Sequence, residues 1–516
     1  MGADFLRHSS RAPVRRSVGR IPARPVTDSC FHFEEPLKKR LVSAAMRSTP
    51  IRALSSGQPA CRPLAITLAG LLIAGCSGEP GAAPDTAGEA GLAFSDRPAS
   101  LAYHQFSSGP SLAWGQGSSD PLDPDYGALS FFVAAVPERT GALGEGRRVV
   151  LELADGVATA AQVADGEVAA AHVSGGSLNP AWGFLVNSIP FGPDFEDMAT
   201  FLYDAGGLEL VNHAFQERGV DVVALPVVGS PEQIAGYFRK PLGIPDCPGE
   251  DAECQAHGNG IGIAGLCAKP WTLRYLPPAE TILDRACDRL GGERRMDFVQ
   301  AIPGGSAFLT AVQQGAIDGF EFATPIDDWD ATRGGFFANP EAPAGSDGRT
   351  LGEVGLRFVH HPGWHQPFFL GWMVIQRSGI WDRLDLDQQD ALRVAGRAAL
   401  LDSHRATESV QCHYFQRIMQ STNGLNQRDP AGEVREASAG MVLTRWTDPD
   451  VALLRSVAVE VMEEGRGGGS PTPDQVDYGR ILDALLAHLG HGSVQDMADA
   501  WLGAGEASPL AACIGR

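Results

Sequence analysis

The feature that most constrains the fold is a long helical pattern in the C-terminal half of the chain, from Leu386 to Met419. Asp387 and Asp390 place negative charge in its first turn, and the segment TNG at 422–424 ends it. About 34 residues at 1.5 Å each give a rod of roughly 50 Å. Because such a rod is longer than a single ordinary core, we expect it to run across two lobes.

The first half of the chain alternates strand and helix patterns. Residues 147–155 (RRVVLELAD) predict a strand, and residues 158–176 predict a helix, an Asp-Gly turn and a buried strand. Residues 194–218 then predict two helices, and residues 221–228 predict a further strand. This order is typical of a parallel sheet. Since 516 residues exceed one ordinary core, we predict an α/β fold of two lobes.

Residues 303–329 (PGGSAFLTAVQQGAIDGFEFATPIDDW) predict a loop, a short helix and a strand, with Glu321 at the C-terminal end of that strand. In open α/β sheets, ligands bind at the carboxyl ends of the strands. A carboxylate at this place can hold a metal, pair with a ligand cation, or face water.

The N-terminal region has the pattern of an export signal. Residues 1–45 are rich in Arg and Pro and lack periodicity, so we interpret them as an over-extended start before a true start at Met46. Residues 46–75 combine positive charge, a short apolar run and a lipobox that leads into Cys76. We predict a lipoprotein signal peptide there, lipidation of Cys76 and a flexible tether over 76–97. The alternative is a chance apolar run near a cysteine.

The charge of the chain excludes some classes of partner. The net charge is −21, and residues 1–75 hold 12 basic and 4 acidic residues, so the mature chain keeps 29 basic and 58 acidic ones. Nucleic-acid and anionic-membrane binding are therefore disfavoured. A small anionic ligand would need a site that concentrates positive charge.

The cysteines indicate disulfides. After Cys30, Cys61 and Cys76, six of the nine cysteines remain, an even number in an exported chain. The alternative is a zinc site made by the first four of them, but their spacings contain no CxxC pattern. Spacing does not give the connectivity, although a small loop between Cys247 and Cys254 is plausible.

Two segments, 304–329 (GGSAFLTAVQQGAIDGFEFATPIDDW) and 360–384 (HHPGWHQPFFLGWMVIQRSGIWDRL), resemble the solute-binding proteins of tripartite ATP-independent periplasmic (TRAP) transporters. The branch that binds α-keto acids is the most similar, with its "PGWHEP"-like turn. VNSIPFG at 186–192 and GSPEQIAGYFRK at 229–240 match further family motifs. The resemblance covers roughly residues 98–490.

The resemblance implies a two-lobed periplasmic-binding-protein-like fold with a long helix that spans both lobes. We place lobe I at residues 98–228 and 322–370, and lobe II at residues 229–321 and 371–512. The implied function is an extracytoplasmic receptor, located in the periplasm and lipid-anchored to a membrane. It binds a small organic acid (a 2-oxo or 2-hydroxy carboxylate) in the cleft between the lobes and delivers it to the permease subunits.

The resemblance also implies a set of ligand-binding residues. Arg274 matches the Arg that pairs with the ligand carboxylate, and Gln233 matches the Gln after the first crossing between the lobes. A sodium or calcium ion would bridge the ligand through Glu321, the backbone carbonyl of Phe322, Gln366 and Gln233. No organic cofactor is implied.

The residue types in this set suit such a role, but each has a plainer interpretation. Arg274 offers a planar fork that fits a carboxylate, or it pairs with a structural acid. Glu321, Gln233 and Gln366 carry oxygens that hard cations prefer, or Glu321 faces solvent at a strand end.

Three other residues are candidates for the cleft. Trp364 forms a flat wall for the ligand, or pins the turn as a core residue. Asn179 is a candidate ligand-binding residue, and His172 is another; core and loop roles explain both equally well.

Two rival functions remain open. A metal-dependent hydrolase could use Glu321 and His365, and His360, His361 and His365 could form a transition-metal site. Against an enzyme, the sequence has no GxSxG or HExxH motif. A binding module linked to a sensor is the second rival.

Overall fold

The computed structural model of the protein describes most of the chain between residues 99 and 501. All of these residues belong to one compact unit, Ala83–Arg516. The described residues are 99–105, 118–123, 126–238, 240–246, 260–268, 271–275, 278–291, 296–298, 311, 316–321, 323–328, 358–421, 441–501, 510 and 513. The proposed start, signal peptide, lipidation site Cys76 and tether, together with Phe322, Cys247 and Cys254, lie outside them.

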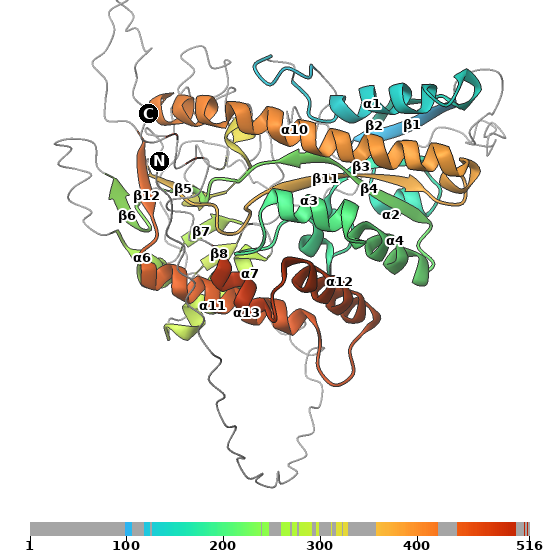
Figure 1. Ribbon diagram of the computed structural model, residues 1–516. Coiled ribbons are helices and arrows are strands. Elements are labelled where there is room, and N and C mark those ends of the chain that lie inside the picture. The colour runs from blue at the N-terminus through green and yellow to red at the C-terminus, as the bar shows by residue number, and fades with distance from the viewer. Residues whose placement is uncertain are drawn as a thin grey trace, which may run out of the picture. The chain divides into compact units, whose positions relative to one another are not determined.

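The first sheet has five strands in the order β2-β1-β3-β11-β4 (Figure 1). β1 pairs in parallel with β2 and β3, whereas β11 runs antiparallel to β3 and β4. Its strands are β1 (Ala99–Gln105), β2 (Val149–Val157), β3 (Ala170–Ser174), β4 (Val222–Ser230) and β11 (Phe369–Gln376). The accompanying helices are α1 (Ser130–Gly141), α2 (Ala160–Ala164), α3 (Phe195–Asp204) and α4 (Gly207–Glu217).

Local signals explain why these helices begin where they do. Thr159 and Gln162 form a capping box at the start of α2, each side chain bonding the backbone N–H of the other. Asp194 caps α3 by accepting a hydrogen bond of 2.9 Å from the backbone N–H of Asp197. β4 is buried along its whole length, as expected for a strand covered on both faces. The predicted strand–helix–strand order and parallel pairing are confirmed.

The second sheet has seven short strands in the order β6-β12-β10-β5-β9-β7-β8. β7 is parallel to β8 and to β9, while β5 is antiparallel to β9 and β10. The strands are β5 (Gly236–Phe238), β6 (Ile244–Asp246), β7 (Trp271–Arg274), β8 (Met296–Phe298), β9 (Gly319–Phe320), β10 (Phe358–His360) and β12 (Val442–Arg445). Nearby helices are α6 (Gly262–Cys267) and α7 (Ala279–Arg289).

The chain passes between the two sheets at residues 231–235, which connect β4 to β5, and at residues 361–368, which connect β10 to β11. The second passage differs from the expected lobe boundaries. β10 belongs to the second sheet and β11 to the first, the reverse of what the ranges 322–370 and 371–512 imply. The reason is that β11 inserts antiparallel between β3 and β4, a pairing that no local pattern reveals.

The long helix α10 (Leu386–Ser421) has 36 residues and contacts both sheets. It packs on β4 and α1 of the first sheet, and its Phe415 and Ile418 join the apolar cluster of Tyr237 and Val359 in the second. The predicted helix that spans both halves is confirmed, and so is the mixed α/β fold with two sheets.

Three further helices follow β12. They are α11 (Asp448–Gly465), α12 (Pro473–Leu489) and α13 (Val494–Ala500). Each begins at a Thr or Ser whose side chain accepts a backbone hydrogen bond from the third residue of the helix. α12 ends at Gly490, whose φ of 73° is the left-handed conformation of a glycine cap.

Two disulfides are present among the described residues, Cys267–Cys287 and Cys412–Cys513. The prediction of disulfides is therefore confirmed for four of the six cysteines. Because Cys267 pairs with Cys287, these two cannot join a zinc site. None of the helices in the described part of the chain is both long enough and apolar enough to cross a bilayer.

Candidate functional site

Arg274 and Glu321 meet at the carboxyl ends of two neighbouring parallel strands. Arg274 is the last residue of β7, and Glu321 follows β9 directly. The Glu321 backbone N–H donates to the Arg274 carbonyl over 3.1 Å, and Arg274 Nη1 donates to the Glu321 carbonyl in return. The same nitrogen lies 3.4 Å from Glu321 Oε1. The structure thus brings together the two charged groups that the sequence singled out.

Both groups are removed from water, since Arg274 is 9% and Glu321 1% exposed. Burial strengthens their mutual attraction and makes each charge costly on its own. The solvent-facing interpretation of Glu321 is therefore wrong. The contact with Glu321 agrees with the alternative interpretation, in which Arg274 pairs with a structural acid. In this arrangement the guanidinium faces the carboxylate of Glu321.

The negative charge of Glu321 also acts on Tyr275. Burial, followed by the charge of Glu321, raises the pKa of Tyr275 well above its usual range. The Tyr275 hydroxyl donates to the Ala235 carbonyl, just before β5. This bond joins the end of β7 to the passage at 231–235.

A tight turn holds Gln233 and Gln366 together. The Gln233 backbone N–H donates to the Gln366 carbonyl over 3.1 Å, and the Gln366 N–H donates to the Gly363 carbonyl over 3.0 Å. A Cβ at Gly363 would lie 2.0 Å from the Gln233 carbonyl oxygen, so only glycine allows this approach. The two passages between the sheets are therefore in direct backbone contact.

The side chains of Gln233 and Gln366 suit a cation. They are 4% and 7% exposed, and their Oε1 atoms have no hydrogen-bond partner among the described residues. Buried amide oxygens without partners are ligands that sodium and calcium accept. The donor set therefore fits the implied ion.

Trp364 is a buried residue of the turn between β10 and β11. Its ring stacks on Phe191, with ring centroids 5.4 Å apart and an interplanar angle of 20°. Its carbonyl accepts a hydrogen bond of 3.0 Å from the Phe191 backbone N–H. Trp364 is 2% exposed, so it pins the turn to the segment before α3. Its Nε1 has no hydrogen-bond partner among the described residues.

The three histidines of this turn contact different residues. His360 Nδ1 lies 2.8 Å from Thr444 Oγ1, and His361 Nε2 lies 3.4 Å from Glu232 Oε1. The His365 ring packs against Tyr275. Within the described ranges, no group of three or more His, Cys, Asp or Glu side chains is placed to hold a metal ion. The geometry does not support a transition-metal site here.

Asn179 makes its polar contacts within its own turn and with α12, and no hydrogen bond joins it to Arg274 or Glu321 among the described residues. Its Oδ1 accepts from the backbone N–H groups of Ala181 and Trp182, and its Nδ2 donates to Asp474 over 3.3 Å. These bonds close a turn after β3 and tie it to α12. His172, in the middle of β3, is buried, as its alternative core role requires.

Sequence reasoning missed a buried acid beside Glu321. Asp328 is 1% exposed, accepts a hydrogen bond of 2.7 Å from the Tyr237 hydroxyl and another of 3.0 Å from the Ala323 backbone N–H. Burial raises the pKa of Asp328 well above its usual range. The adjacent acids Asp327 and Asp328 after the strand were the available signal, but such a pair is equally typical of a solvent-exposed helix start.

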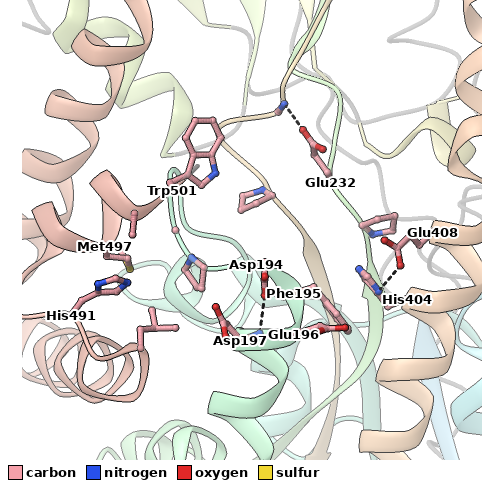
Figure 2. A pocket seen from close by; sticks show the side chains of 17 residues that line it. Asp194, Phe195, Glu196, Asp197, Glu232, His404, Glu408, His491, Met497 and Trp501 are labelled. Carbon is pink, nitrogen blue, oxygen red and sulfur yellow. Dashed lines mark hydrogen bonds and ion pairs between the residues drawn. The ribbon is translucent and has the colours of Figure 1, made fainter. Parts of the chain in front are cut away.

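A cavity of about 520 Å³ lies next to the two passages between the sheets (Figure 2), and its lining does not include Arg274, Glu321, Gln233, Gln366 or Trp364. It is lined by the start of α3, by α10 and by the region from the end of α12 to Trp501, and it also touches both passages between the sheets. Its acidic lining residues are Asp194, Glu196, Asp197, Glu232 and Glu408. Because five carboxylates repel an anion, this cavity is a poor site for an organic acid.

No protein-family model matches the chain. A curated monocarboxylate 2-oxoacid-binding periplasmic protein from a Nostoc species is 24% identical to it over 218 residues. The match covers 42% of this chain and 45% of the relative, so the chain spans about half the length of the curated relative.

Solved TRAP transporter solute-binding proteins are also similar. One from Bordetella bronchiseptica, with calcium and picolinate, has a TM-score of 0.49 and 13% identity, covering 76% of this chain and 92% of that one. Another from Pseudoalteromonas atlantica, with sodium and pyruvate, has a TM-score of 0.48 and 14% identity, covering 80% and 97%. The similarity to the curated relative agrees with the resemblance that the sequence motifs indicated.

Proposed function

We propose that the protein is an extracytoplasmic receptor that binds a small organic acid, a 2-oxo or 2-hydroxy carboxylate, and delivers it to a TRAP-type permease. The observation that carries the proposal is the buried contact of Arg274 with Glu321 at two strand ends. The curated relative, which is named for binding 2-oxoacids, supports the same class of ligand.

In this proposal, the Arg274 guanidinium binds the ligand carboxylate through two parallel N–H donors. The nearby carboxylate of Glu321 would repel an anion that arrived alone. A sodium or calcium ion held by Glu321, Gln233 and Gln366, with the Phe322 carbonyl, supplies the positive charge that joins acid and ligand. Trp364 supplies a flat wall, and Asn179 is left out because its side chain already bonds to another part of the fold.

We further propose that residues 46–75 direct export and that a lipid on Cys76 holds the protein at a membrane, with 76–97 as the tether. The passages at 231–235 and 361–368, together with α10, act as the hinge on which the two halves close over the ligand. The closed form is the one that the permease recognises. No bond chemistry takes place, and neighbouring genes for a permease rather than a sensor kinase would agree with this role.

The test is the Arg274→Ala variant. Removing one partner of a buried, charge-assisted contact costs about 2–5 kcal/mol, so calorimetry should show pyruvate affinity at least roughly 30-fold weaker. The matched control is Arg405→Ala, whose side chain is 70% exposed, and which should bind as the unaltered protein does. Unchanged affinity in Arg274→Ala would overturn the site, and turnover of the bound acid would favour a hydrolase instead.

A further inference from the structure

His365 lies among the residues of the proposed site, although its role is not yet explained. It belongs to the turn that connects β10 to β11 and is 2% exposed. Its ring packs against Tyr275, with centroids 5.6 Å apart, and against Trp364, with centroids 5.7 Å apart. Its chain neighbour Gln366 is hydrogen-bonded to Gln233.

The ladder between β5 and β9 places the segment before β5 beside the strand end that carries Glu321. Tyr237 pairs with Phe320, so the residues before β5 run alongside those after β9. Tyr275 bonds to Ala235 in that segment, and the charge of Glu321 is felt at the Tyr275 hydroxyl. The imidazole of His365 therefore packs on the residue that follows Arg274 in the chain and that the charge of Glu321 reaches.

Both ring nitrogens of His365 lack a hydrogen-bond partner among the described residues. A buried polar group without a partner loses the hydrogen bonds it made with water, and native proteins contain few of them. Such an arrangement is expected when the partner is a ligand. The Trp364 ring that packs on it has an Nε1 atom in the same condition, and so do the Oε1 atoms of Gln366, its chain neighbour, and of Gln233.

We infer that His365 determines which acids the site accepts, by hydrogen-bonding the oxygen on carbon 2 of the ligand while Arg274 holds the carboxylate. The inference rests on the proposed function. An imidazole carries one nitrogen that donates and one that accepts, so it can donate to a 2-oxo oxygen or accept from a 2-hydroxyl. A site with such a group rejects acids that lack this oxygen, because the buried nitrogen is then left without a partner.

The test compares pyruvate, lactate and propionate by calorimetry, at one fixed concentration of sodium or calcium. The unaltered protein should bind pyruvate and lactate at least tenfold more tightly than propionate. In His365→Phe, which keeps a ring of similar size, affinity for pyruvate and lactate should fall at least tenfold. Affinity for propionate should stay within about threefold. His365→Asn, which restores a donor and an acceptor, should recover part of the preference.

The outcomes separate this inference from the proposed function. If the unaltered protein binds none of the three acids, the proposed function fails. If His365→Phe still prefers pyruvate and lactate to propionate, the ion recognises the oxygen on carbon 2 and the inference is overturned. If its affinity for all three acids falls equally, His365 has a structural role and the inference is overturned as well. If His365→Phe does not fold, His365→Leu is measured in its place under the same criteria. The control is His213→Phe, a position with a 58% exposed side chain.

Discussion

At the scale of single residues, Gly363 decides whether the two passages between the sheets can touch. Its backbone lies against the Gln233 carbonyl, and the turn it begins carries Trp364, His365 and Gln366. Its own N–H donates to Glu232 Oε1 over 3.0 Å. The glycine of the "PGWH" motif is thus explained by close packing of the backbone.

We predict that Gly363→Ala destabilises the protein by roughly 1–3 kcal/mol and weakens ligand binding, because the new methyl forces the two passages apart. Thermal unfolding and calorimetry measure the two effects. Gly479→Ala is the control, since a Cβ there meets nothing within 4 Å, and alanine in a helix interior should be neutral or stabilising. Equal behaviour of the two variants would contradict the packing argument.

His404 is a second residue with a measurable property. Its ring stacks on Phe195 with centroids 3.6 Å apart, and burial lowers its pKa to about 4. The nearby positive charge of Arg405 acts in the same direction. Glu408 lies 3.8 Å from Nδ1 (Figure 2), which is too far to hold the proton on the ring against these effects.

The pKa of His404 predicts a loss of stability in acid. An unfolded histidine titrates near 6.5, so between pH 6.5 and 4 the unfolded chain binds the extra proton and stability falls as the pH falls. At pH 5 the loss should approach roughly 2 kcal/mol relative to pH 7. His404→Gln removes this group, so urea unfolding at both pH values should show a smaller loss in the variant. An identical pH dependence in both proteins would show that His404 is not the source.

At the scale of elements, α10 depends on a covalent contact near its C-terminal end. Cys412 of α10 is joined to Cys513, and Leu510 packs in the same apolar cluster as Phe415 and Ile418. The cross-link therefore fixes the end of the chain to the part of α10 that packs on the second sheet.

The two disulfides close loops of different length, with sequence separations of 101 for Cys412–Cys513 and 20 for Cys267–Cys287. Loop entropy gives about 4.7 and 3.3 kcal/mol respectively, so replacing the first pair by serine should lower the melting temperature more. Melting of the two double-serine variants under oxidising conditions tests the order. The reverse order would show that local packing outweighs loop entropy.

At the scale of the whole molecule, the negative charge of the chain opposes the binding of an anion. The net charge is −21, and the cavity beside the two passages is itself lined by carboxylates. In the proposed function, Arg274 and a bound cation offset this charge where the ligand sits, and binding is coupled to closure of the two halves.

We therefore predict that pyruvate stabilises the protein only when sodium or calcium is present. A ligand at 100 times its dissociation constant adds about 2.7 kcal/mol, which a thermal-shift assay detects. Removing calcium with a chelator, and sodium by dialysis into a sodium-free buffer, should abolish the shift. An equal shift without the ion would remove the cation from the proposed site.

Much of the fold was predictable because its signals are local. The helices over 195–204, 207–217 and 386–421 follow from apolar spacing, caps and glycine breaks that act within a few residues. The sheets that β10 and β11 join could not be predicted, because strand pairing joins residues far apart in the chain and a short apolar strand fits either sheet.

The site was predictable in part. Strand ends in an α/β fold collect ligand-binding groups, and the family resemblance singled out Arg274 and Glu321, which the structure brings together. The contacts of Asn179 were not predictable, since only the structure shows that its amide closes a turn and reaches Asp474. Asp328 and Tyr237 were missed because their burial and mutual hydrogen bond depend on contacts across 91 positions of sequence.

By itself, the sequence determined the long helix, the two helices between 194 and 218 and the α/β class, since each depends on neighbours along the chain. Only the tertiary structure decided which sheet β11 joins, that Arg274 faces Glu321 away from water, and that His365 is buried without a hydrogen-bond partner. These properties come from burial and pairing between distant segments, and their free energies arise only when the segments meet.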